Sequence, residues 1–205
     1  MEDGSKEPCG FIVDDIRRAW MIRRGESTPY DHHIICLTTQ EFCLRFGHYS
    51  RENIHRVQHN TQHATSKMPS GSCLCGGVRI TYSGSPSLTT LCHCNGCKRN
   101  SGSTYSTNII VPADSLRVTQ GGSMLKTFMK MQTATGNIGV NYFCSNCGTT
   151  MWMDTNSIPG ARIVKAGVMD NDAVESAKPS VEFFATGRVG WVPPVGGASQ
   201  CRTMQ

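Results

Sequence analysis

The chain has 205 residues and a formal net charge of +5, a length that fits one domain of ordinary size with an extension. No stretch approaches the roughly 18 apolar residues that a bilayer span needs, and residues 1–15 lack the apolar run of a secretory signal. These features argue against a membrane protein and predict a soluble, cytoplasmic one. In a reducing compartment, the eleven cysteines favour metal binding or catalysis over a disulfide framework.

The positive charge is confined to the second part of the chain. Residues 1–67 contain nine Lys or Arg and nine Asp or Glu, whereas residues 68–205 contain eleven and six. The basic residues of that second part are spread along it and form no cluster. Seven metal-bound thiolates would reduce the excess further. The charge pattern therefore argues against a nucleic-acid partner.

The composition changes near residue 68, which divides the chain into an extension (1–67) and a domain (68–205). Residues 14–24 (DDIRRAWMIRR) place apolar side chains at helical spacing and predict a short amphipathic helix. Residues 52–67 are polar without a sustained period, as in linkers or disordered segments. We expect the extension to be poorly structured or partly helical, and to contribute no chemistry.

The domain is predicted to be all-β, built of short antiparallel strands. Its strand-like segments are rich in β-branched and aromatic residues, recur about every ten residues and are mostly bounded by turn formers. Residues 72–205 contain no convincing long helix, and a core made in this way is thin enough to need a brace such as a metal ion. The predicted strands are residues 78–82, 106–111, 115–119, 124–131, 139–143, 149–153, 161–168 and 181–186.

Two cysteine pairs have the spacing of a closed zinc site. Cys144 and Cys147 form a C-x-x-C turn that brings both sulfurs to one ion, and Gly148 after it is free to take a positive φ. Cys73 and Cys75 form C-x-C, and residues two apart in a strand project from the same face. Together these four thiols predict a structural zinc site that ties the start of the domain to a later hairpin.

A second group, Cys92, Cys94 and Cys97, lies in CHCNGCKRNSG and has one thiol too few to close a tetrahedral site. Three protein ligands with one open position are typical of a catalytic zinc, whose remaining position binds water or substrate. The alternatives are a structural site completed by His93 or by another cysteine. Because His93 lies between two ligands, and adjacent residues seldom bind one tetrahedral ion, we expect it to point elsewhere.

Four motifs in this order and at these separations, GSCLCGGVRI, CHCNGCKRNSG, NYFCSNCGTTMW and VKAGVMD, resemble the glutathione-dependent formaldehyde-activating (GFA) family. That family shares its domain with centromere protein V. The resemblance covers about residues 70–193 and includes TGRVGW, which looks like the family's closing strand. It implies a β-tent fold with a structural zinc at Cys73, Cys75, Cys144 and Cys147, and a catalytic zinc at Cys92, Cys94 and Cys97.

The resemblance also implies a reaction, in which the thiol of glutathione meets formaldehyde at zinc to give S-hydroxymethylglutathione. Written in reverse, this is carbon–sulfur lyase chemistry. Lys98 and Arg99 follow the three cysteines directly, so they either bind the carboxylates of glutathione or are ordinary surface charges. Asp170 is either a polar partner near the site or a turn former.

Two other functions stay open at this point. One is a lyase, cyclase or isomerase that acts on a larger biosynthetic or toxic electrophile with the same open zinc. The other is a non-catalytic binding module similar to centromere protein V, which predicts a basic tail that residues 1–67 do not provide. The expected partner is a small carbonyl compound or thiol adduct, with monomers and homodimers both open.

Overall fold

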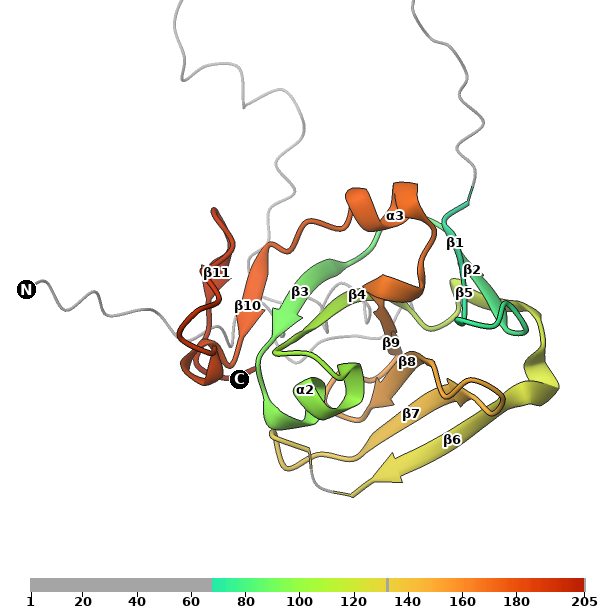
Figure 1. The fold of residues 1–205 in the computed structure, drawn as a ribbon, viewed down its shortest axis with the longest axis horizontal. Helices are drawn as coiled ribbons and strands as arrows, with labels where there is room; N and C mark the ends of the chain where they lie inside the picture. Colours follow the sequence, from blue (N-terminus) through green and yellow to red (C-terminus); the bar gives the residue numbers. More distant parts are fainter. Residues whose placement is uncertain (1–67, 132, 205) are drawn as a thin grey trace, which may run out of the picture. The chain divides into compact units, whose positions relative to one another are not determined.

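The computed structural model describes residues 68–131 and 133–204, so the expectations for residues 1–67 lie outside the described residues. The described part consists of short strands with few and short helices, which confirms the all-β prediction (Figure 1). The strands are β1 (Ser70–Ser72), β2 (Arg79–Tyr82), β3 (Leu88–Cys92), β4 (Ser106–Pro112), β5 (Leu116–Gln120), β6 (Leu125–Lys130), β7 (Gly139–Cys144), β8 (Thr150–Thr155), β9 (Ala161–Lys165), β10 (Val181–Phe183) and β11 (Ser199–Gln200). The α-helices are α2 (Asn95–Ser101) and α3 (Asn171–Glu175), and the 3₁₀ turns are η3 (Gly122–Met124), η4 (Ala166–Val168) and η5 (Ala185–Gly187).

The strands form two sheets. The smaller has the order β1-β2-β5, and the larger has the order β11-β10-β3-β4-β9-β8-β7-β6. Most neighbours are antiparallel, as expected for strands joined by short turns. The exceptions are β10 with β3 and β10 with β11, which are parallel. The chain therefore returns near its C-terminal end to lie beside the strand that leads into the three-cysteine motif.

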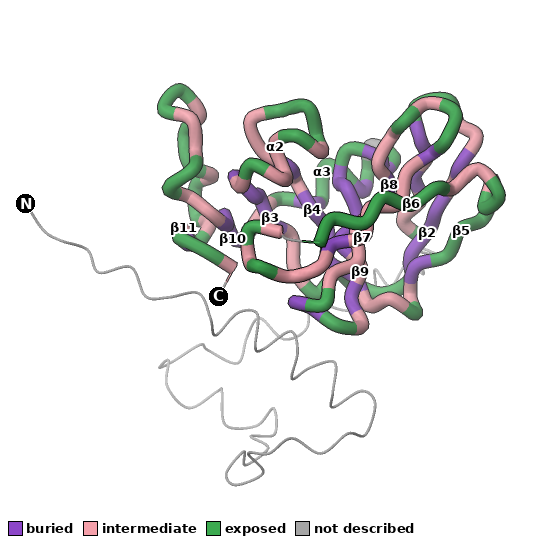
Figure 2. Tube along the Cα trace, turned by 90° about the horizontal axis from the view of Figure 1, so that it is seen from below, coloured by how far each residue is buried: buried purple, intermediate pink, exposed green. Residues whose placement is uncertain are grey.

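The larger sheet has buried side chains on both of its faces. On β4, adjacent Ile109 and Ile110 project to opposite sides and belong to two different apolar clusters. The first cluster includes Val78 and Ile80 of the smaller sheet, so the two sheets share that core. The second includes Phe183 of β10 together with the thiols of the three-cysteine motif. The edge strand β6, in contrast, is exposed along most of its length (Figure 2).

Glycine allows a close approach between the smaller sheet and the segment that follows β9. Gly71 in β1 forms an isolated bridge with Met169. A Cβ atom at position 71 would lie 2.3 Å from the carbonyl oxygen of Val168, which is closer than van der Waals contact allows. Glycine at this position therefore lets β1 pack directly on the turn after β9.

All eight predicted strands are present, with small differences at their ends. The segment predicted as 161–168 is a strand only to Lys165, and its last three residues form η4. The segment predicted as 181–186 ends at Phe183, because Phe184 has φ 55° and turns the chain out of the extended conformation. The sequence did not predict β1, β3 or β11, which are short or lack strong alternation.

None of the helices among the described residues has the length and apolar content that crossing a bilayer demands. The longest α-helix that the structure describes, α2, has only seven residues. It begins only a few residues after β3, so the three-cysteine motif runs from the end of β3 into α2 with a short connection between them.

Candidate metal centre

Four thiols meet between the smaller sheet and the end of β7. Atoms of Cys73, Cys75, Cys144 and Cys147 that could bind an ion all lie within 4.8 Å of one another. The Sγ of Cys75 lies 3.5 Å from that of Cys73 and 3.8 Å from that of Cys144. Cys73 and Cys144 are buried. The structure thus brings together the four residues that spacing assigned to one closed site.

The backbone around these thiols is shaped for an anionic sulfur. Gly76 and Gly148 both take the positive φ expected of a tight turn after a cysteine, at 72° and 73°. The N–H of Val78 donates to the Sγ of Cys73 at 3.2 Å. Burial raises the pKa of Cys73, and this N–H···S bond opposes the shift by favouring the deprotonated sulfur that a metal needs. The donor set and its surroundings therefore fit a zinc ion.

Three further thiols meet where β3 ends and α2 begins. Cys92 is the last residue of β3, Cys94 is the N-cap of α2, and Cys97 lies in its first turn. Their sulfurs also lie within 4.8 Å of one another, and the N–H of Cys97 donates to the Sγ of Cys94 at 3.3 Å. The helix is set by local caps, since Cys94 closes its start and Gly102, with φ 64°, closes its end.

The three sulfurs oppose one another's ionisation. Hydrogen bonds from the thiols of Cys92 and Cys97 lower the pKa of Cys94. Hydrogen bonding to Cys94 and Cys97, together with burial, raises the pKa of Cys92 far above its usual range. A divalent ion removes this conflict because it stabilises every thiolate at once. The donor set therefore fits a metal ion with three thiolate ligands.

His93 does not complete this site. Its ring is buried, and its Nε2 lies 2.8 Å from Oε2 of Glu182 on β10. Glu182 also accepts from Arg188, at 3.1 Å from Nε and 3.0 Å from Nη2, and from Nε2 of Gln200 at 3.0 Å. Burial alone would raise the pKa of Glu182. These hydrogen bonds, together with one from the backbone N–H of Val195, instead lower it to about 2. His93 thus fastens the cysteine motif to β10.

A cavity of about 80 Å³ opens beside the three-cysteine group, and all three of these cysteines line it. Its other walls include the apolar side chains of Met153 and Phe184 and the amides of Asn100 and Asn141. The two amides are linked, since Nδ2 of Asn100 donates to Oδ1 of Asn141 at 2.7 Å. The four-cysteine group contributes no residue to this cavity. All three thiols of the three-cysteine group therefore border one cavity, whereas the four-cysteine group has only Cys147 at the wall of another cavity, of about 540 Å³.

Two lysines line the cavity, and the sequence analysis assigned neither of them to the site. Lys130 is exposed at the end of β6, whereas Lys165 on β9 is only 8% exposed. Burial lowers the pKa of Lys165, and the negative charge of Cys97, Cys92 and Cys94 opposes that shift. The sequence ARIVK contains a signal for the burial of Lys165. On a strand, Lys165 shares a face with the apolar residues Ala161 and Ile163, and both faces of this strand are mostly buried.

Lys98 and Arg99, the predicted glutathione-binding residues, line neither this cavity nor a second one of about 540 Å³. Nζ of Lys98 donates to the carbonyl oxygen of Gly187 at 2.6 Å, and Arg99 is exposed on α2. Their binding role stays a prediction. Asp170 accepts a hydrogen bond from Ser70 and precedes α3, so it lies with β1 and not at the three-cysteine group.

Comparison with known proteins extends these observations. A family model described as glutathione-dependent formaldehyde-activating enzyme matches residues 68–187. A Halomonas elongata protein, provisionally named as such an enzyme, is 29% identical over 104 residues. That match covers 50% of this chain and 66% of the relative, slightly under two thirds of its length.

Among solved structures, a Rhodobacter sphaeroides protein is similar with a TM-score of 0.39 and 20% sequence identity. The similarity covers 64% of this chain and 98% of that protein, and at this score it supports no conclusion about the present fold. The family match spans more than half of the chain and includes both cysteine groups. The chain therefore belongs to the glutathione-dependent formaldehyde-activating enzyme family.

Proposed function

We propose that this chain is a zinc enzyme that makes or breaks a carbon–sulfur bond between glutathione and formaldehyde or another small carbonyl compound. The observation that supports this most directly is the difference between the two cysteine groups. Four thiols form a complete donor set away from the cavity, while three thiols line the cavity wall. A four-thiolate site is structural, and a three-ligand site that a small molecule can reach is the arrangement of catalytic zinc.

Each group would then have its own role. Cys73, Cys75, Cys144 and Cys147 would hold a structural zinc that links the segment between β1 and β2 to the hairpin of β7 and β8. A zinc ion held by Cys92, Cys94 and Cys97 would lower the pKa of a bound thiol and polarise a carbonyl oxygen.

The size of the cavity favours a small carbonyl substrate. A single water molecule needs about 10–15 Å³ of such volume, so about 80 Å³ admits only a few non-hydrogen atoms. Formaldehyde and the CH₂–S end of glutathione fit this volume. The rest of the tripeptide would lie toward the solvent, where the ammonium of Lys130 is available to its carboxylates.

The protein side chains around the thiols would orient the reactants and limit the access of bulk water. Met153 and Phe184 present apolar surface to the cavity, which limits hydration of the carbonyl carbon. The hydrogen bond between Asn100 and Asn141 fixes the orientation of two amide dipoles in the cavity wall. In the addition, the thiol proton leaves to water, the sulfur forms a bond to carbon, and the C=O electron pair moves to oxygen. That oxygen then takes a proton from water.

Metal analysis and a glutathione titration of the full chain test this proposal. We expect two zinc ions per chain. With Co²⁺ in their place, glutathione should change the visible thiolate–cobalt absorption of one of the two ions. S-methylglutathione has no free thiol and is the matched control, which should leave the spectrum unchanged. A single metal ion per chain, or no spectral response to glutathione, would contradict the proposal.

A further inference from the structure

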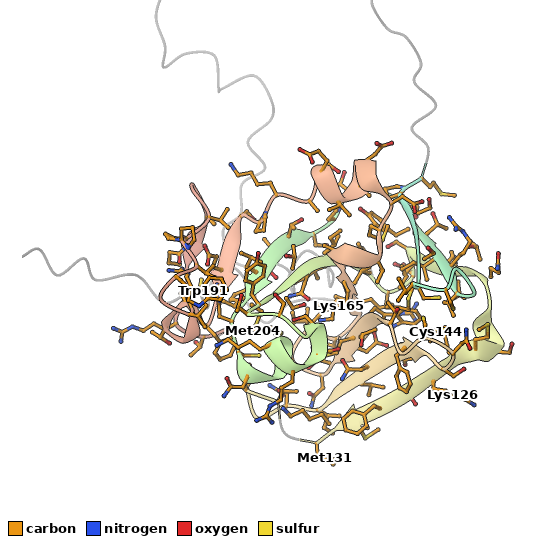
Figure 3. The ribbon with its side chains drawn as sticks, viewed as in Figure 1. Lys126, Met131, Cys144, Lys165, Trp191 and Met204 are labelled. Carbon is orange, nitrogen blue, oxygen red and sulfur yellow. The ribbon has the colours of Figure 1, made fainter. Side chains whose placement is uncertain are left out.

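The most unusual charged group in the described structure is the ammonium of Lys165. Lysine is rarely this deeply buried without a partner carboxylate, yet Lys165 is 8% exposed and takes part in none of the ion pairs found among the described residues. Its side chain lies in the interior, in contrast to Lys126 on β6 at the periphery (Figure 3). Burial of such a charge lowers the free energy of unfolding, so this lysine reduces the stability of the fold.

The ammonium is oriented by two neutral side chains of β4. Nζ donates to Oδ1 of Asn108 at 2.9 Å and to Oγ of Ser106 at 3.3 Å. Asn108 is the direct cross-strand neighbour of Lys165, and its Oδ1 also accepts from the hydroxyl of Ser106 at 2.9 Å. A lysine ammonium has three N–H donors. These two bonds therefore leave one donor for a ligand.

Strand register places this ammonium close to the three thiols. Ser106, which accepts from Lys165, is paired directly with Cys92 across β3 and β4. Side chains in such a pair have Cβ atoms about 5 Å apart, so the ammonium and the Cys92 sulfur lie within the span of one small molecule. Lys165 and the three cysteines also line the same cavity of about 80 Å³.

We propose that Lys165 is a catalytic residue, whose third N–H donates a hydrogen bond to the oxygen of the one-carbon unit joined to sulfur. This inference rests on the proposed function and assigns it a residue. When the thiolate sulfur bonds to the carbonyl carbon, the C=O π electron pair moves to oxygen, which becomes an alkoxide. The oxygen takes its proton from water, and Lys165 keeps its own. A fixed cationic donor stabilises this developing charge more than it stabilises the neutral carbonyl.

The first test compares Lys165→Met, which keeps the length of the side chain but removes its donors, with Lys165→Gln, which keeps an N–H donor without the charge. Exchange NMR on the zinc-loaded full chain measures the rate between free formaldehyde and its glutathione adduct. We expect Lys165→Met to lower kcat by about 100-fold, the usual effect of removing an oxyanion donor, and Lys165→Gln to lower it less. Lys126→Met, at a surface lysine that lines neither of the two cavities described above, is the control and should match the wild type.

Metal analysis and thermal unfolding accompany each variant, so that loss of zinc or of the fold is not read as a loss of catalysis. Should Lys165→Met not fold, Asn108→Ala replaces it, since it removes the acceptor that orients Nζ while Lys165 stays, and it should lower kcat about tenfold. A folded, zinc-loaded Lys165→Met variant within threefold of the wild type would overturn the proposal, and so would an unchanged kcat for Asn108→Ala. Equal losses in Lys165→Met and Lys165→Gln would also overturn it, because they would indicate a counter-ion role.

Formate binding, measured by calorimetry, separates this proposal from the proposed function. Formate carries an anionic oxygen on a single carbon, and we expect Lys165→Met to bind it at least tenfold more weakly than the wild type. If the wild type shows no exchange activity but this difference in binding holds, the formaldehyde reaction is wrong and the oxygen site stands. If the wild type and Lys165→Met bind formate equally, Lys165 is not an oxygen-binding residue, whatever the activity.

Discussion

At the scale of single residues, the site is defined by side chains that lie far apart in the sequence. Cys92, Cys94 and Cys97 come from one short motif, but Lys130 and Lys165 reach the cavity from β6 and β9. The lysine closest to the motif in sequence, Lys98, instead bonds to the carbonyl oxygen of Gly187. Proximity along the chain therefore did not predict which lysines line the cavity.

The position of Lys130 predicts a role in binding glutathione. Its exposed ammonium would pair with a carboxylate of glutathione, an interaction of about 0.2–1 kcal/mol in water. We expect Lys130→Ala to raise KM for the glutathione adduct about two- to fivefold and to leave kcat nearly unchanged. Lys126→Ala serves as the control, since Lys126 is exposed on the same strand and lines neither of the two described cavities. An unchanged KM in steady-state kinetics would exclude a role for Lys130 in binding.

At the scale of elements, the connection between β3 and β10 holds the three-cysteine motif in place. β10 lies parallel to β3, and Glu182 on it binds the ring of His93, which sits between Cys92 and Cys94. Arg188 and Gln200 complete the bonds to the same carboxylate. This buried cluster links the C-terminal strands to the candidate catalytic motif, although none of its members is a metal ligand.

The Glu182 cluster predicts a defined pH dependence of stability. A carboxylate whose pKa is lowered to about 2 by folding contributes stability above its unfolded value of about 4.5, and that contribution disappears as the pH falls through about 2. We expect Glu182→Gln to lower Tm at pH 7 by roughly 5–10 °C, since hydrogen bonds to a buried charge contribute about 1.5–3 kcal/mol.

The measurable quantity is the difference in Tm between wild type and Glu182→Gln at several pH values. Acid also protonates the metal-binding thiolates, but it does so in both proteins, so the difference isolates Glu182. This difference should shrink between about pH 4.5 and pH 2. Glu175→Gln, at an exposed glutamate, should show no difference at any pH. A gap that stays constant down to pH 2 would contradict the assigned pKa shift.

At the scale of the whole molecule, we expect the two cysteine groups to have different roles, one in stability and one in reactivity. The four-cysteine group joins segments about 70 residues apart, from Cys73 to Cys147, and a metal that closes so long a loop restricts the unfolded chain strongly. The three-cysteine group joins the end of β3 to the first turn of α2, which are neighbours in the chain, so a metal there would add little to the connectivity of the fold.

Matched cysteine variants test this division. Cys144→Ser should abolish the cooperative thermal transition, because a structural zinc contributes on the order of several kcal/mol to folding. Cys94→Ser should keep a cooperative transition, bind one zinc ion fewer and lose activity. Calorimetry and metal analysis on both proteins check the pair. A Cys94→Ser variant with full turnover, or a Cys144→Ser variant that melts as the wild type does, would contradict the two roles.

The sequence alone predicted most of the strands and both cysteine groups. Short-range spacing was sufficient for this, since strand alternation and the turns of C-x-C and C-x-x-C motifs depend on residues that are near one another in the chain. The helix α2 was missed because its residues, NGCKRNS, have low helical propensity, and its ends are set by Cys94 and Gly102.

Tertiary structure alone decided what surrounds the three thiols. The burial of Lys165, the bond from His93 to Glu182 and the small cavity all result from strands that pair across long stretches of chain. Both faces of β4 and β9 are buried, so alternation in the sequence could not tell which side faces the site. Local patterns determine which residues can bind a metal, and the long-range register of the sheet determines which other groups reach it.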